Sequence, residues 1–224
     1  MGESSPIWAR IVHLWLIALI SIGPSMVRSA RYTYPPELSA TRQRRVWSRW
    51  LNEGGVPDGE GVVILLMGVS GAGKTTVGWL LASQLGWEFA DGDDFHPAAN
   101  VEKMRNGIPL TDADRAPWLE TLRVLIAGWI AAGKNAVVAC SALKRAYRES
   151  LRVRPEVQIV HLRGTPQLLQ QRLRARVAHF MTERMLASQL AALEEPEDAV
   201  VVEVDRSPAE IVGEIRARLG LKKP

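Results

Sequence analysis

The chain has 224 residues, of which 47% are hydrophobic and 23% charged, and its net charge is +4. This length and composition suit one α/β core with an extension. The single cysteine, Cys140, excludes an intramolecular disulfide framework and favours a reducing compartment. Most of the net charge comes from residues 1–58, which hold seven arginines and four acidic residues (a net +3 of the total +4), so we expect no nucleic-acid partner.

Residues 1–58 read as an N-terminal extension. The apolar run Ile11–Ile22 is shorter than the roughly 20 residues of a membrane span. It could be the h-region of a signal peptide, and the basic, tryptophan-containing stretch Arg42–Trp50 could touch a membrane surface or act as a transit segment. We interpret the extension as disordered or leader-like, and membrane contact is the less favoured alternative. The segment Asn52–Gly61 (NEGGVPDGEG) reads as a linker, with the folded domain over residues 59–224.

From residue 59 onward, short apolar runs alternate with helical patterns. This alternation predicts an α/β fold with a five-stranded parallel sheet flanked by helices. The expected strands are Val62–Met67, Trp87–Ala90, Asn135–Cys140, Val157–Leu162 and Ala199–Val204. The first expected helix follows Gly68–Thr75 and runs through Leu85. The others are His96–Asn106, Asp114–Ala132, Leu143–Arg152, Pro166–Arg176, Met185–Leu193 and Pro208–Leu219.

In the long helix expected over Asp114–Ala132, Pro117 is placed in the first turn, where a missing N–H costs little. Trp118, Leu122 and Trp129 then share one face, which predicts packing against the sheet.

Gly68–Thr75 (GVSGAGKT) fits the phosphate-loop pattern GxxxxGK[ST], after a buried strand and before a helix. Its glycines let backbone N–H groups wrap an anion at a helix N-terminus. We expect Lys74 to reach the β- and γ-phosphates of ATP and the Thr75 hydroxyl to bind Mg²⁺. The sequence therefore predicts a P-loop NTPase-type fold. The nucleotide-binding residues expected here are Gly68, Ser70, Gly71, Ala72, Gly73, Lys74, Thr75 and Thr76.

Three carboxylates, Asp91, Asp93 and Asp94, follow the second expected strand. Ligands bind at the carboxyl ends of strands in open α/β sheets, and a cation or substrate hydroxyls would relieve the repulsion between these charges. Asp91 could orient Mg²⁺ through water, and Asp93 could accept or position the proton of an attacking hydroxyl. A solvated Asx turn is the alternative.

Several further blocks occur in order along the chain: Asp91–Asn100 (DGDDFHPAAN), Pro109–Leu119 (PLTDADRAPWL), Cys140–Arg148 (CSALKRAYR), the His179-Phe180 pair and Met185–Pro196 (MLASQLAALEEP). Together with the phosphate loop they resemble gluconokinases of the small P-loop type. The resemblance covers residues from about 62 to the C-terminus and none of residues 1–58. Ala178 departs from it, because the family usually has glycine before the His-Phe pair.

The resemblance implies transfer of the ATP γ-phosphate to the terminal hydroxyl of D-gluconate, which gives 6-phosphogluconate. It also implies an adenylate-kinase-like arrangement, with a substrate-binding helical segment near residues 93–118 and a lid near 172–184. A cytoplasmic homodimer is the expected form, since a secreted enzyme would lack ATP.

Phosphoryl transfer needs charge neutralisation, for which Lys74, Arg172 and Arg176 are candidates, although the arginines could form a solvated helix face. The residues assigned to catalysis are Lys74, Asp93 and Arg176, with Arg172 on the nucleotide and with Thr75 and Asp91 on the metal. The residues assigned to the acceptor are Asp93, His96, Arg105, Ser141, Arg148 and His179. Ser141 could instead cap the next helix.

Three other functions stay open at this point. A shikimate-kinase-like enzyme would share the fold and the acidic turn. A nucleotide-binding regulatory protein without turnover would use the N-terminal segment as its active part. A kinase tethered to a membrane by residues 7–23 is compatible with catalysis.

Overall fold

The computed structural model describes residues 61–175 and 183–221. All of them belong to one compact unit, Asn52–Pro224. The expected extension 1–58, with its apolar run Ile11–Ile22, lies outside the described residues. No helix within the described ranges combines the length and the apolar composition that a bilayer crossing requires.

The described residues build one parallel sheet of five strands in the order β2-β3-β1-β4-β5, which confirms the predicted fold class. The strand order places β1 at the centre, where Leu65 pairs with Val138 of β3 and Ile159 of β4. Every residue of β1 is buried, as expected for a strand covered on both faces. The strands are β1 Val63–Met67, β2 Glu88–Asp91, β3 Ala136–Ala139, β4 Val157–Arg163 and β5 Val200–Glu203.

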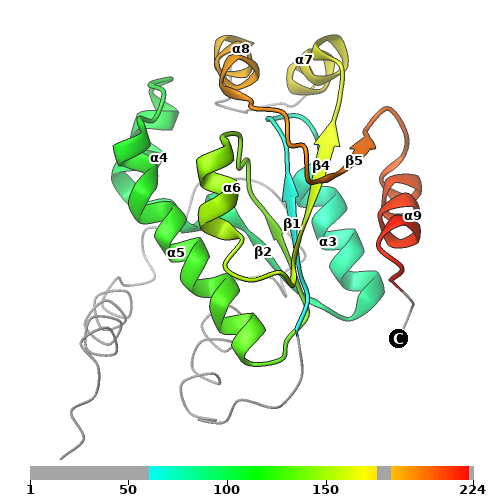
Figure 1. Cartoon of the computed structure of the whole chain (residues 1–224). Helices are drawn as coiled ribbons and strands as arrows, with labels where there is room; N and C mark the ends of the chain where they lie inside the picture. Colours follow the sequence, from blue (N-terminus) through cyan, green and yellow to red (C-terminus); the bar gives the residue numbers. More distant parts are fainter. Residues whose placement is uncertain (1–60, 176–182, 222–224) are drawn as a thin grey trace, which may run out of the picture. The chain divides into compact units, whose positions relative to one another are not determined.

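Helices cover both faces of the sheet (Figure 1). Helices α3 and α9 pack together on one face, where Ile64 and Leu66 of β1 join their apolar side chains in the core. Helices α5 and α6 pack together on the other face, and α7 and α8 lie next to each other beyond the carboxyl ends of the strands (Figure 1). The helices are α3 Lys74–Leu85, α4 Ala98–Arg105, α5 Asp112–Ala131, α6 Arg145–Leu151, α7 Pro166–Arg174, α8 Glu183–Ala192 and α9 Pro208–Arg218.

Helix α5 begins two residues earlier than predicted. The Thr111 side chain accepts a hydrogen bond from the Asp114 backbone N–H, and the Asp114 carboxylate accepts one from the Thr111 N–H at 2.9 Å, which forms a capping box. Pro117 is consequently the sixth residue of the helix. The prediction that it stands in the first turn is therefore wrong, and the proline removes one internal hydrogen bond. The predicted packing of Trp118, Leu122 and Trp129 is confirmed, since all three are buried.

The helix expected over His96–Asn106 begins two residues later, as α4. A 3-10 turn, η2 (Gly92–Phe95), ends at His96, and α4 begins only at Ala98. His96 and Pro97 between them have extended backbone conformations, as the residue before a proline usually does. The acidic residues and His96 therefore stand between the carboxyl end of β2 and the start of α4.

Candidate nucleotide and acceptor site

The phosphate loop joins β1 to α3, and its glycines are required by its geometry. Gly71 and Gly73 have φ angles of +87° and +91°, which side-chain-bearing residues rarely adopt. A Cβ on Gly68 would lie 2.7 Å from the Leu162 carbonyl oxygen. Gly73 is the N-cap of α3 and provides no side-chain cap. The first N–H groups of α3 can therefore point at an anion.

Two side chains of the loop have defined partners. The Lys74 ammonium donates to the Val69 carbonyl at 3.3 Å, so it is folded back over its own loop. The Thr75 hydroxyl donates to Asp91 Oδ2 at 2.5 Å. Strands β1 and β2 are not neighbours in the sheet, but their parallel direction brings the phosphate loop and the acidic turn to the same edge.

Asp91 has two structural roles in the acidic turn. Besides the bond with Thr75, its Oδ1 accepts from the Asp93 backbone N–H at 3.1 Å and so caps η2. Burial and, second, the charge of the Asp93 carboxylate raise the pKa of Asp91 to about 6, although the Thr75 hydrogen bond acts to lower it. Desolvation, followed by the charges of Asp91 and Asp93, raises the pKa of Asp94 to about 7. The turn thus concentrates negative charge that a cation would relieve.

His96 follows the acidic turn and contacts the side chains of Trp118 and Asn100. Its ring stacks on Trp118, with centroids 4.2 Å apart, and its Nδ1 lies 3.4 Å from Asn100 Nδ2. Trp118 in turn donates to the Gly92 carbonyl at 2.7 Å. Desolvation, with the nearby positive charge of Arg115, lowers the pKa of His96 to about 4. A neutral, fixed imidazole can donate or accept a hydrogen bond to a hydroxyl group.

The loop after β3 contains an unusual backbone conformation. Ala142 is buried and has a φ of +43°, a strained value for alanine. Arg148 is 5% exposed, and its guanidinium donates to the carbonyls of Ala142 (3.2 Å) and Leu143 (3.0 Å). The Ser141 carbonyl accepts from the Gly68 N–H at 3.3 Å, which ties this loop to the phosphate loop. The cap of α6 is Lys144, so the alternative that Ser141 caps that helix is wrong.

The remaining predicted residues are only partly brought together. Arg172 on α7 lies beside the phosphate loop, with Nη1 4.0 Å from where a Cβ on Gly73 would stand, and Nη2 donates to the Val204 carbonyl at 2.5 Å. Thr76 is exposed on α3, and Arg105 lies in the exposed last turn of α4. Arg176 and His179, with most of the predicted lid, lie outside the described residues, as does Ala178.

Two residues beside the site had no role assigned from the sequence. Gln189 of α8 accepts from the Ser70 backbone N–H at 2.7 Å, and the Glu194 carboxylate accepts from the Arg145 backbone N–H at 2.5 Å. Both belong to the Met185–Pro196 block on which the resemblance partly rests. A polar residue within a stripe of leucines was the available signal for Gln189.

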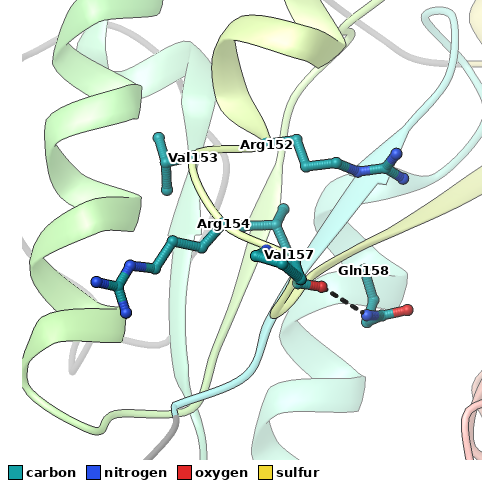
Figure 2. A pocket seen from close by; sticks show the side chains of 6 residues that line it. Arg152, Val153, Arg154, Val157 and Gln158 are labelled. Carbon is teal, nitrogen blue, oxygen red and sulfur yellow. Dashed lines mark hydrogen bonds between the residues drawn. The ribbon is translucent and has the colours of Figure 1, made fainter.

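A surface pocket lies at the opposite edge of the sheet. Figure 2 shows its side chains around the connection from α6 to β4, with Gln158 donating to the Pro155 carbonyl at 3.1 Å. This connection precedes β4, whereas the phosphate loop follows β1, and the two strands run parallel. The pocket is therefore remote from the phosphate loop and belongs to a different surface.

Residues 63–196 match a family model described as an AAA domain. With the parallel sheet and the GxxxxGK[ST] loop between β1 and α3, this match makes the chain a nucleotide-binding protein of the P-loop class.

Similarity to known proteins identifies the family within this class. The chain is 52% identical over 136 residues to the gluconokinase of Gluconobacter oxydans. This match covers 60% of this chain and 76% of the relative. It is 42% identical over 180 residues to a probable gluconokinase of Xenopus tropicalis, with 72% and 95% covered. The solved structure of a gluconokinase from Sinorhizobium meliloti is 41% identical, with a TM-score of 0.66 over 72% of this chain and 93% of that chain. The chain belongs to the gluconokinase family.

Proposed function

We propose that this protein transfers the γ-phosphate of ATP to the terminal hydroxyl of D-gluconate. The observation that carries the proposal is the arrangement at the carboxyl edge of the sheet, in a chain of the gluconokinase family. The phosphate loop, the Asp91–Asp94 turn and the loop Ser141–Lys144 follow β1, β2 and β3, so they converge on one edge. A nucleotide and a small acceptor can meet there.

The phosphate loop supplies the donor side. Its backbone N–H groups and the N-terminus of α3 would hold the phosphates, while Lys74 would leave the Val69 carbonyl for the β- and γ-oxygens. Arg172, beside Gly73, is placed to add positive charge, and Arg176 stays a prediction in the same role. These groups would neutralise the charge that spreads over the transferring phosphoryl group.

The residues at Thr75 and Asp91 fit Mg²⁺. A hydroxyl and a carboxylate oxygen already face each other at 2.5 Å, and Mg²⁺ prefers oxygen ligands completed by water and substrate phosphates. The raised pKa of Asp91 reflects a buried carboxylate without enough positive charge around it. Thr75 and Asp91 would hold the ion, which would supply positive charge against the phosphates of ATP.

The acidic turn and His96 supply the acceptor side. Asp93 is exposed at the start of η2 and would accept the proton of the attacking hydroxyl. The oxygen of that hydroxyl would bond to the γ-phosphorus, while the bond between this phosphorus and the β–γ bridging oxygen breaks. His96 would bind a hydroxyl of the polyol chain. Arg105, Ser141, Arg148 and His179 stay predictions for the rest of the acceptor.

The domain boundaries, the cellular location and the oligomeric state are part of the same proposal. We expect a kinase domain over residues 59–224 that works in the cytoplasm, where ATP is available, and that forms a homodimer. Gel filtration with light scattering would test the dimer.

The decisive experiment is ATP consumption by the purified protein with Mg²⁺ across an acceptor panel of D-gluconate, other sugar acids, shikimate and no acceptor. Turnover with gluconate well above the other acceptors is the expected result. Turnover with shikimate or another acid would keep the kinase and change its substrate. ATP binding without turnover on any acceptor would contradict the proposal and favour a regulatory protein.

A further inference from the structure

Gln189 occupies an unusual position on α8. Leu186, Leu190 and Leu193 pack into the core, and Leu186 is only 4% exposed. Gln189 is three residues after Leu186 and four before Leu193, so it lies on the same stripe. A polar amide on an apolar face is costly unless it is hydrogen-bonded.

The bond that Gln189 makes reaches the phosphate loop. Its Oε1 accepts from the Ser70 N–H at 2.7 Å, although the two residues are 119 positions apart. That N–H and the Val69 carbonyl are the two ends of a single peptide unit. The Val69 carbonyl is the group to which the Lys74 ammonium donates, at 3.3 Å. Because a trans peptide is planar, with its N–H and C=O pointing in opposite directions, fixing one end orients the other.

The position of α8 does not depend on this bond alone. Directly after the helix, the Glu194 N–H donates to the Leu143 carbonyl at 2.9 Å, and its carboxylate accepts from the Arg145 N–H. On the other side of the loop, a Cβ on Gly71 would meet the Leu169 carbonyl of α7 at 3.1 Å. Gln189 is therefore presented to the loop by an independently anchored helix.

We infer that Gln189 is a positioning residue for phosphoryl transfer, because its amide oxygen holds the Val69–Ser70 peptide so that the Val69 carbonyl faces the Lys74 ammonium. Lys74 is then kept over the loop before the nucleotide binds, instead of sampling solvent. The inference rests on the proposed function, since it assigns Gln189 to the ATP side of that reaction. The effect should therefore appear in the kinetics for ATP and not in those for the acceptor.

The test compares Gln189→Met and Gln189→Glu in the full-length protein. Methionine keeps the length and helix propensity of glutamine but cannot replace its amide acceptor, whereas a glutamate oxygen still accepts. In the methionine variant we expect faster hydrogen exchange at the Ser70 amide by NMR, and kcat/KM for ATP lowered about tenfold. The KM for gluconate and the melting temperature should stay at the wild-type values. The glutamate variant should keep the protection of Ser70.

Gln167→Met, on the exposed surface of α7, is the matched control and should behave as wild type in every measurement. The inference fails if Gln189→Met leaves ATP kinetics and Ser70 exchange unchanged. It also fails if the melting temperature and the gluconate KM change together with the ATP kinetics, or if the glutamate variant loses Ser70 protection as methionine does. If the wild type turns over no acceptor, the proposed function fails. Ser70 exchange in the same variants, with and without a non-hydrolysable ATP analogue, then still decides the role of Gln189.

Discussion

The Thr75 hydroxyl donates to the carboxylate of Asp91 across 2.5 Å, from the start of α3 to the end of β2. Asp91 is 8% exposed, and its other oxygen caps the acidic turn. One carboxylate thus joins the phosphate loop to the turn that carries Asp93. Any cation that binds Thr75 and Asp91 would stand between the donor and acceptor halves of the site.

Asp91→Asn should raise the Mg²⁺ concentration needed for half-maximal turnover. The amide oxygen can still cap η2 while the amide N–H donates to the Thr75 hydroxyl oxygen, but the side chain offers the metal no negative charge. Titration of Mg²⁺ at saturating ATP and gluconate measures this shift, with Asp198→Asn, on the exposed loop before β5, as the control. An unchanged Mg²⁺ requirement would exclude Asp91 from the metal site.

Lys74→Ala should reduce turnover by a factor of about 10² to 10³, because the transferring phosphoryl group loses a fixed positive charge. The fold should persist, since the ammonium makes one contact within its own loop. Measurement of kcat, together with circular dichroism, checks both statements. Wild-type turnover in a folded Lys74→Ala protein would refute the mechanism.

Asp93→Asn should lower kcat by roughly 10²-fold or more and leave ATP binding close to the wild-type value. The reason is that Asp93 is assigned to the acceptor proton, while the backbone N–H that bonds to Asp91 survives the substitution. Steady-state kinetics and calorimetric titration with an ATP analogue separate the two effects. Equal losses in both would assign Asp93 to the metal or to the fold.

His96 should make stability depend on pH. Its pKa is lowered to about 4 in the folded protein, from an ordinary 6.5, so the unfolded chain binds more protons between these values. The contribution of neutral His96 to the unfolding free energy is complete above about pH 6.5 and is lost as the pH falls towards 4. The loss in unfolding free energy is on the order of 1 kcal/mol. His96→Phe, which keeps a ring against Trp118, should flatten the fall in unfolding free energy between pH 7 and pH 5. An equally steep fall in both proteins would assign the pH dependence of the unfolding free energy to other groups.

The fold was predictable because its signals are local. The alternation of apolar runs with helical patterns predicted the sheet, and the spacing GxxxxGK[ST] predicted the phosphate loop. The start of α5 has a local signal too, because Thr111 and Asp114 have capping-box spacing, although the expected helix begins only at Asp114. These are contacts between residues three or four positions apart, which sequence patterns record.

The contacts that complete the site join residues distant in the chain. Gln189 and Ser70 meet because α8 lies beyond the carboxyl ends of the strands (Figure 1), and no local pattern states which backbone group a glutamine reaches. The direction of the Arg148 side chain was also unpredictable from the sequence, since an arginine after a strand can point at solvent, at a ligand or into the protein. In the fold the Arg148 guanidinium is buried and donates to the carbonyls of Ala142 and Leu143, a choice of partner that no local pattern states.

Arg148→Met tests whether this arginine supports the loop or binds the acceptor. Methionine fills similar space but leaves the Ala142 carbonyl without its guanidinium donor, and each such buried group costs about 1–3 kcal/mol. We expect a lower unfolding free energy in urea, with Arg154→Met, on the connection after α6 where this residue is exposed, as a milder control. A change in the gluconate KM should then accompany the loss of stability, because the strained loop relaxes near the acceptor. A large rise in the gluconate KM at wild-type stability would instead make Arg148 a direct ligand of the substrate carboxylate.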